Sequence, residues 1–392
     1  MNPAIDREQL IQLLRDLVST DSVNPSLVPG ASGEQAVAKF LSELLRQHAL
    51  PAELQDAAPG RPNVISWLGP DPPLRDGRRH ASLGIFAHID TVGAGDMPGP
   101  FRPAEKDGRL YGRGALDIKS GVAAMIAAAL AAARSGVGLA RTVLLAAVVD
   151  EECDSIGTSR LLEEFRVDAA IVMEPTNLLL VVAHKGFAWF EVIARGRAAH
   201  GSLPAEGRDA IRAMGRVLQK LDLIEASLRL QPPHPLLGDA SLHASLISGG
   251  QELSSYPAEC RLQYERRLLP GESEQTAREE LERAIAELQS SDAEFSASVR
   301  SLAARPPYEI SPDAPIARAA GAAIRAVTGD LRVAGMSPWT DTALLAAQGI
   351  PGVVFGPSGR GLHGREEYVL LESVDTCAQV LLRLILDICA EK

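Results

Sequence analysis

Residues 84–92 read G-I-F-A-H-I-D-T-V, and this stretch indicates the fold class. The run Leu83–Ala87 is short and apolar, which is typical of a buried strand. It ends at His88 and Asp90, where open α/β sheets bind ligands, beyond the carboxyl ends of their strands. Side chains two apart in an extended chain point the same way, so Asp90 is placed to orient the His88 ring. Alone, an H-x-D triplet more often marks a surface turn, so the context must decide.

Composition excludes several classes of protein. The chain has 392 residues and a formal net charge of −11, with 46% hydrophobic and 23% charged residues. These values predict a globular protein of two or more domains, and the acidic balance argues against nucleic acid or an anionic membrane as partner.

Cysteine usage and the N-terminus bear on the compartment. The four cysteines match no metal-finger or redox spacing, which favours reduced thiols. Residues 1–10 lack the apolar core of a signal peptide. The longest near-apolar stretch, residues 121–133, is too short to span a bilayer. We therefore expect a cytoplasmic protein.

Strands that end in acids recur along the chain. Thr142–Val149 is a second buried-strand pattern and runs into Asp150, Glu151 and Glu152, and Ala169–Met173 is a third and runs into Glu174. Helical patterns lie between them, as in Ser120–Ala133. This alternation predicts an α/β fold with a mostly parallel mixed sheet flanked by helices.

The pattern changes after residue 183. Strands and helices with hairpin-length links then predict a small antiparallel α+β unit. We expect a discontinuous domain of residues 1–183 and 300–392, interrupted by an inserted domain of residues 184–299. Local signals add Asp6 and Ser32 as helix N-caps and a loop over Asp71–His80.

The side chains that follow the strands are those that bind metals. The acids and histidines in question are His88, Asp90, Asp117, Glu151, Glu152, Glu174 and His363. Two histidines and at least three carboxylates suffice for two divalent ions, of which zinc fits best and cobalt or manganese are alternatives. One carboxylate can bridge such a pair.

Glu151 and Glu152 are expected to have different roles. Adjacent residues of an extended segment point apart, so one acid can bind metal while the other reaches a metal-bound water as general base.

Each residue also has a simpler interpretation. Asp117 could cap the Ser120 helix, the Glu151–Glu152 pair could be a solvated strand end, and Glu174 could be a turn residue before proline. His363 could be an exposed loop histidine. Their joint placement after successive buried strands favours the metal site.

The chain resembles the dinuclear zinc metallohydrolases that include aminoacylase, acetylornithine deacetylase, succinyl-diaminopimelate desuccinylase and carboxypeptidase G. The resemblance runs nearly end to end. Its signatures are A-H-I-D-T-V at 87–92, Y-G-R-G-A-L-D-I-K-S-G at 111–121, D-E-E at 150–152, M-E-P-T at 173–176, A-A-H-G-S at 198–202 and G-L-H-G-R-E-E-Y-V at 361–369.

The resemblance implies a set of metal ligands. Asp117 would bridge two metals, His88 and Glu174 would complete one site, and Glu152 and His363 the other. The catalytic domain would be zinc exopeptidase-like, and the inserted domain would serve as lid and dimerisation domain.

It also implies catalytic and substrate-binding roles. Asp90 would orient His88, and Glu151 would be the general base and then the proton donor. His200 would reach a neighbouring subunit's active site and hydrogen-bond the scissile carbonyl oxygen. Arg267 would hold a substrate carboxylate. From the residues alone, His200 would be a hairpin histidine and Arg267 a surface charge.

At two positions that bear on substrate recognition, the sequence departs from the family's usual pattern. Ser254 stands where the family often has asparagine, and Glu265 stands where it usually has aspartate. In this family the position of Glu174 tends to be glutamate in acylases and aspartate in peptidases.

We therefore expect a homodimeric, metal-dependent amidohydrolase in which metal-bound hydroxide cleaves an N-acyl-amino acid. The alternatives are a di- or carboxypeptidase acting on dipeptides, or a catalytically silent binding protein. No ligand position is missing, which argues against the silent protein.

Overall fold

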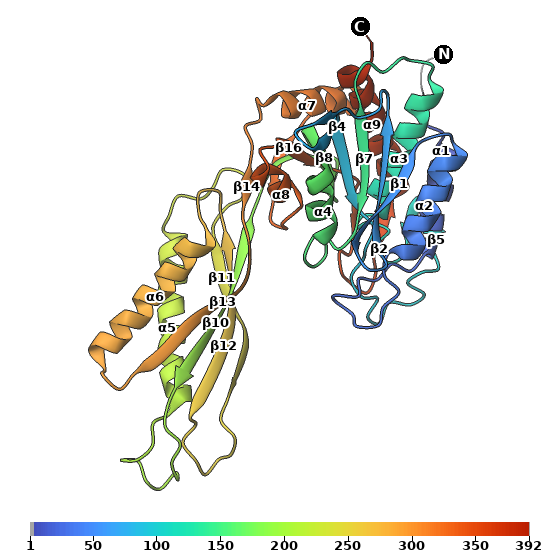
Figure 1. Ribbon diagram of the computed structural model, residues 1–392. Coiled ribbons are helices and arrows are strands. Elements are labelled where there is room, and N and C mark those ends of the chain that lie inside the picture. The colour runs from blue at the N-terminus through green and yellow to red at the C-terminus, as the bar shows by residue number, and fades with distance from the viewer. Residues whose placement is uncertain (1–3, 392) are drawn as a thin grey trace. The chain divides into compact units, whose positions relative to one another are not determined.

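The computed structural model describes residues 4–391, which divide into two compact units (Figure 1). The first unit takes the described residues up to Val182, then Ile310–Ala334 and the residues from Thr340 onwards. The second takes Ala183–Glu309 and Gly335–Trp339. The inserted domain was expected to end at residue 299, whereas the second unit extends to Glu309. The difference arises because strand β13 (Ser296–Arg305) continues past residue 299 and belongs wholly to the second unit's sheet.

The main sheet is mixed, with its parallel strands at the centre. Its order is β1-β2-β7-β4-β8-β16-β9-β14, with β15 beside β9 and β3 beside β4. The bounds are β1 (Ala52–Ala58), β2 (Arg61–Leu68), β3 (Leu74–Arg75), β4 (Arg78–His88), β7 (Val143–Val148), β8 (Phe165–Met173), β9 (Leu180–His184), β14 (Tyr308–Glu309), β15 (Val333–Met336) and β16 (Gly352–Phe355). The pairs β7–β4, β4–β8 and β8–β16 are parallel, whereas β1–β2, β2–β7 and β16–β9 are antiparallel. The predicted α/β class with a mixed sheet is thus confirmed, whereas the expected parallel pairing is confined to the central strands β7, β4, β8 and β16.

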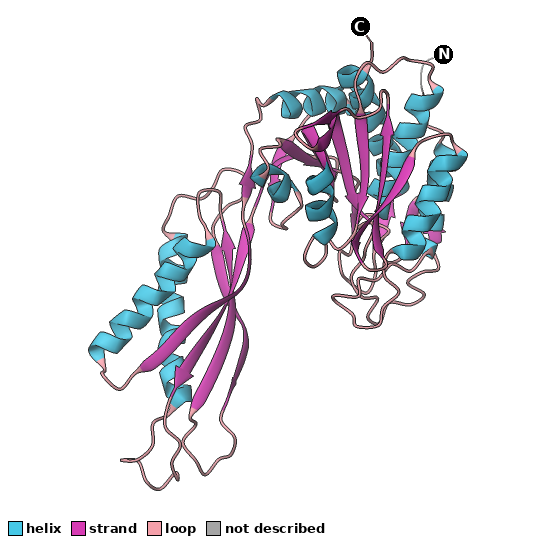
Figure 2. Ribbon diagram, in the orientation of Figure 1, coloured by secondary structure: helices cyan, strands magenta, loops and turns pink. Residues whose placement is uncertain are grey.

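Helices cover both faces of this sheet (Figure 2). They are α1 (Arg7–Ser19), α2 (Gln35–Gln47), α3 (Lys119–Arg134), α4 (Ile156–Glu164), α7 (Pro315–Thr328), α8 (Thr342–Ala347) and α9 (Leu371–Cys389). In β7, Leu144 and Ala146 join the cluster under α4 and α8, while Leu145 and Ala147 face α2 and α3. Burial on both faces explains why the central strands read as continuous apolar runs.

Of the two predicted helix N-caps, one is confirmed and the other is wrong. Asp6 is confirmed as the N-cap of α1, because its carboxylate accepts the backbone N–H of Gln9 at 3.1 Å. Ser32 is wrong as a cap: α2 begins after Glu34, and the Ser32 hydroxyl donates to Asp21 at 2.9 Å.

The predicted loop over Asp71–His80 is wrong in its second half. That half is a β3–β4 hairpin, turned at Asp76 and Gly77 with φ of 49° and 78°. An Asp-Gly pair in this conformation is a common two-residue hairpin turn.

The second unit is an antiparallel sheet with two helices on one face. Its strand order is β11 (Ser241–Gly249), β12 (Glu259–Leu268), β10 (Gly186–Arg195), β13. Helices α5 (Ala210–Arg229) and α6 (Glu274–Ser291) pack on it through a buried core that includes Phe190, Met214 and Leu281. β11 and β13 are the edge strands.

A small sheet supports the loops of the first unit. Its order is β17 (Gly359–Arg360), β18 (Tyr368–Leu370), β6 (Arg109–Tyr111), β5 (Ala104–Lys106). It therefore joins the chain before Asp117 to the chain after His363. Among the helices of residues 4–391, none is long and apolar enough to cross a membrane.

Candidate metal centre

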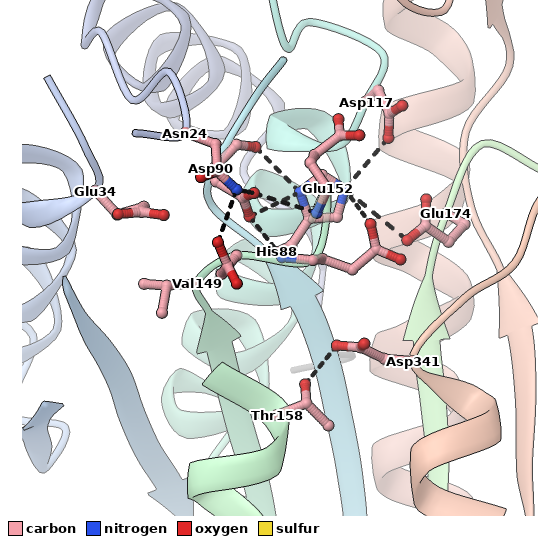
Figure 3. A network of polar contacts seen from close by, with 12 residues as sticks. Asn24, Glu34, His88, Asp90, Asp117, Val149, Glu152, Thr158, Glu174 and Asp341 are labelled. Carbon is pink, nitrogen blue, oxygen red and sulfur yellow. Dashed lines mark hydrogen bonds and ion pairs between the residues drawn. The ribbon is translucent and has the colours of Figure 1, made fainter. Parts of the chain in front are cut away.

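The predicted ligands meet at the carboxyl ends of the central strands, and Figure 3 labels His88, Asp117, Glu152 and Glu174 there. His88 is the last residue of β4, and Glu174 follows β8 directly. Asp117 lies in the loop just before α3, and His363 lies in the loop between β17 and β18. Parallel strands bring their carboxyl ends to one edge, which is why residues distant in sequence converge here.

Asp117 lies between the two histidines. Its Oδ1 is 3.3 Å from Nε2 of His88, and its Oδ2 is 3.3 Å from Nε2 of His363. Nε2 of His363 is also 3.2 Å from Oε2 of Glu152. One carboxylate thus presents an oxygen to each of two groups of side chains. Asp117 makes no cap for α3, whose N-cap is Ile118 without a side-chain hydrogen bond.

Glu151 and Glu152 diverge because of a turn, so the expected extended segment is wrong. The turn follows β7 at Asp150, whose φ is 68°. Glu151 Oε2 lies 4.0 Å from His88 Nε2 on one side, and Glu152 contacts His363 on the other.

Ligand atoms without partners show that the site fits a metal. Two overlapping groups have donor atoms within 4.8 Å of one another, namely His88–Glu151–Glu174 and His88–Asp117–Glu152. Glu152 Oε1 and Glu174 Oε1 are buried and have no hydrogen-bond partner among the described residues. Buried carboxylate oxygens normally have partners, so these two atoms mark positions that a cation would fill.

The electrostatics of the cluster also favour cations. Burial raises the pKa of Glu151 well above its usual value, and the Glu174 carboxylate raises it further. Burial, followed by the Asp117 charge, does the same to Glu174. Hydrogen bonds to Asp117 and Glu152 raise the pKa of His363 to about 10. Acids outnumber bases here, so a divalent cation would stabilise their charged forms.

His88 is oriented by its neighbour in the chain. Its Nδ1 lies 3.0 Å from the backbone oxygen of Asp90, an acceptor, so Nδ1 carries the proton and Nε2 is left as the ligand atom. The Asp90 carboxylate accepts the backbone N–H groups of Glu151 at 3.1 Å and Glu152 at 3.2 Å. Asp90 therefore supports both the histidine and the turn that carries the two glutamates.

A buried polar network continues behind Asp90. The Asn24 side-chain amide donates to Asp90 at 2.8 Å and to Asp150 at 3.0 Å. Arg61 Nη1 lies 2.7 Å from Asp150, and the same guanidinium pairs with Glu34. This network fixes the position of the β4 end relative to the turn after β7.

His200 and Arg267 belong to the second unit, whereas the metal cluster lies wholly in the first. His200 is exposed, and its Nδ1 is 2.7 Å from the Ser202 hydroxyl. Arg267 lies on β12, where Nε donates to Glu265 at 2.6 Å and the guanidinium lies over the Phe187 ring. Glu265 thus pairs directly with Arg267.

Sequence reasoning missed the residues that support the ligands. Asn24 and Arg61 carry no ligand-like pattern, and the only local signal that they share is the proline directly after each of them. Arg113 and Glu367 lie inside the signatures at 111–121 and 361–369, where no role was expected for them.

Comparisons with known proteins agree with this geometry. Residues 84–387 match the model of Peptidase family M20/M25/M40. An acetylornithine deacetylase from Myxococcus xanthus is 31% identical over 395 residues, covering 96% of each chain. Aminopeptidase PepT from Bacillus cereus has the same fold, with a TM-score of 0.79 at 19% identity and coverage of 98% of this chain and 99% of that one.

A dinuclear metal-binding peptidase of family M20 from Bacillus subtilis is also similar in fold. Its TM-score is 0.72 at 19% identity, with coverage of 97% of this chain and 98% of that chain. The strand-end cluster of histidines and carboxylates and the family match over most of the chain lead to one conclusion. The chain belongs to Peptidase family M20/M25/M40 and is a metallohydrolase of amide bonds.

Proposed function

We propose that the protein hydrolyses the amide bond of an N-acyl-amino acid and uses two divalent metal ions to do so. The observation that carries this proposal is the position of Asp117, 3.3 Å from each of His88 and His363. A carboxylate between two such histidines can supply one oxygen to each ion of a two-metal hydrolase.

Five side chains would hold the ions. His88 and Glu174 would bind one, Glu152 and His363 the other, and Asp117 both. Zinc suits this donor set best, and cobalt or manganese would also bind. When bound, such ions polarise the amide carbonyl and lower the pKa of water.

Glu151 is the proposed proton carrier. Its Oε2 lies 4.0 Å from His88 Nε2, so the carboxylate stands beside the position that an ion would fill and can reach a water held there. It accepts a proton from the attacking water as the water oxygen bonds to the amide carbon. It then gives that proton to the nitrogen as the C–N bond breaks. Asp90 keeps Glu151 in place through the backbone hydrogen bond at 3.1 Å.

Two observations favour acyl-amino acids over peptides. The ligand after β8 is Glu174 rather than aspartate, and a relative at 31% identity is an acetylornithine deacetylase. A small-molecule substrate also agrees with the net charge of −11, which disfavours polyanions. The four free cysteines, three of them buried, support a reducing compartment such as the cytoplasm, which cell fractionation would test.

We further propose a homodimer that forms through the second unit. β11 is an edge strand whose apolar residues Leu246 and Ile247 are 65% and 57% exposed. An exposed apolar edge is a template for pairing with another chain. In such a dimer His200 would stabilise the oxyanion in the partner's site, and Arg267 would bind the substrate carboxylate.

The experiment is a panel of N-acetyl, N-succinyl and N-formyl amino acids and dipeptides, with metal-free and zinc- or cobalt-loaded enzyme. Release of free amine from one acyl-amino acid class, only with metal, is expected. Preferential cleavage of dipeptides would overturn the acyl assignment and leave the metal chemistry intact. Absence of bound metal in the purified protein would overturn both.

A further inference from the structure

Arg113 and Glu367 form a buried ion pair beside the metal cluster. Arg113 Nη1 lies 2.7 Å from Glu367 Oε2, and each residue is 2% exposed. Neither side chain is among the groups able to hold a metal within the described residues. An ion pair at this depth loses much of its hydration, so it needs further hydrogen bonds to persist.

The Glu367 carboxylate finds those bonds in the backbone of the Asp117 loop. It accepts N–H groups from Gly114 at 3.1 Å, Leu116 at 2.8 Å and Asp117 itself at 3.1 Å. Together with Arg113 it therefore has four donors. The backbone that carries Asp117 is thus fixed by a residue of the distant C-terminal part of the chain.

Arg113 in turn contacts the loop that carries His363. Its Nη2 donates to the backbone oxygen of Gly364 at 2.9 Å, one residue after His363. His363 lies in a loop with φ of 58°, and its side chain is 52% exposed. Its own packing therefore constrains it little. The Arg113 bond ties the His363 loop to the Asp117 loop.

We propose that Arg113 and Glu367 form a clamp, a pair of positioning residues that sets the spacing between Asp117 and His363. The proposal rests on the two-metal site described above and concerns the ion held by Asp117, Glu152 and His363. Asp117 would also bind the other ion. The remaining ligands of that ion, His88 and Glu174, stand at the ends of strands β4 and β8, so that ion depends less on the clamp. Loss of the clamp should weaken one ion selectively, which a general loss of stability would not do.

The test titrates metal-free protein with Co²⁺ by calorimetry, for the full chain and for Arg113→Lys and Glu367→Gln. Lysine keeps the charge but cannot reach two partners with a planar fork, and glutamine keeps the shape without the charge. The wild type is expected to bind two ions. Each variant is expected to bind one ion with little change in affinity and the other about 10- to 100-fold more weakly.

Arg266→Lys is the matched control. Arg266 is also 2% exposed and pairs with Glu272 at 2.6 Å, but it lies on β12 of the second unit. It is expected to lower the melting temperature and leave both ions bound.

The possible outcomes distinguish the positioning role of Arg113 and Glu367 from the proposed two-metal function. Two ions of unchanged affinity in both clamp variants, or an equal weakening of both ions, would overturn the clamp. No Co²⁺ binding by the wild type would overturn the two-metal function instead. Glu367→Asp, which keeps the charge, serves if either variant does not fold, and failure of all three to fold would overturn a role limited to positioning.

Discussion

The carboxylate of Asp90 accepts the backbone N–H of Glu151 at 3.1 Å. One buried side chain therefore connects the strand end that carries His88 with the turn that carries the proposed base. Asp90→Asn would present an N–H₂ group to one of these donors. We expect kcat/KM and metal affinity to fall by about 10- to 100-fold, as for other residues that support metal ligands. Steady-state kinetics and Co²⁺ titration measure both, and Asp96→Asn, at a side chain 79% exposed, should change neither.

Glu151→Gln removes the proposed proton carrier and preserves its size. We expect kcat to fall by about 100- to 10,000-fold, the usual contribution of general acid–base catalysis. Metal analysis should still find two ions per chain. Glu151 is 4.0 Å from His88, close enough to be a ligand itself. Loss of one ion would therefore show that Glu151 binds metal, and near-normal turnover would reject it as the base. Glu163→Gln, on the surface of α4, is the control.

Asn24→Ala leaves Asp90 and Asp150 without the amide that links them. We expect the free energy of unfolding to fall by about 1–3 kcal/mol, the cost of leaving a buried acceptor unsatisfied. Asn24→Asp should cost more, because it would place a third carboxylate against two others. Urea unfolding measures both. Asn177→Asp makes the same chemical change at an exposed position, and an equal loss there would show that the network is unimportant.

His184 predicts how stability depends on pH. Burial lowers its pKa to about 4, while its Nδ1–H donates to the Lys185 oxygen at 3.0 Å. The folded protein keeps this histidine neutral and the unfolded chain protonates it below about pH 6.5. The free energy of unfolding should therefore fall as the pH falls from about 6.5 to 4, by up to about 1.4 kcal/mol per pH unit from this group.

His184→Asn retains a donor for Lys185 and removes the titration. Its pH dependence should be flatter than that of the wild type over that range. The ring centroids of Trp339 and His184 are 6.2 Å apart, so tryptophan fluorescence follows unfolding of this region. His243→Asn, at a side chain 62% exposed, should keep the wild-type slope.

Ile247→Lys tests the proposed dimer. A charge on the apolar edge strand β11 should prevent pairing and shift the mass by light scattering towards one chain. Leu74→Lys changes a residue that is 72% exposed in the first unit and should leave the mass unchanged. A wild type that is monomeric and fully active would reject the dimer and the role of His200 in the partner's site.

The cluster was predictable because strands and their ends leave strong local patterns. His88, Glu151 and Glu174 each follow an apolar run, and parallel pairing of those runs brings them together. The start of helix α2 was not predictable, and the predicted cap at Ser32 was wrong, because Glu34 turns inward to Arg61 and the helix begins there. That contact joins residues 27 positions apart and has no local signature.

The supporting residues were missed for the same reason. Arg113 and Glu367 are 254 positions apart, and only the fold brings them together. The turn at Asp150 was mistaken for an extended segment because a positive φ at a non-glycine residue is uncommon.

The position of β16 has a consequence for synthesis of the protein. This strand pairs with β8 on one side and β9 on the other, yet it follows both in sequence by about 170 residues, with the second unit encoded between them. At roughly 5–20 residues per second, the ribosome needs about 8–34 s to proceed from β9 to β16. During that time a nascent chain carries His88, Asp117, Glu152 and Glu174 beside an open gap in its sheet. His363 emerges later still, so the complete set of ligands forms only when almost the whole chain has been translated.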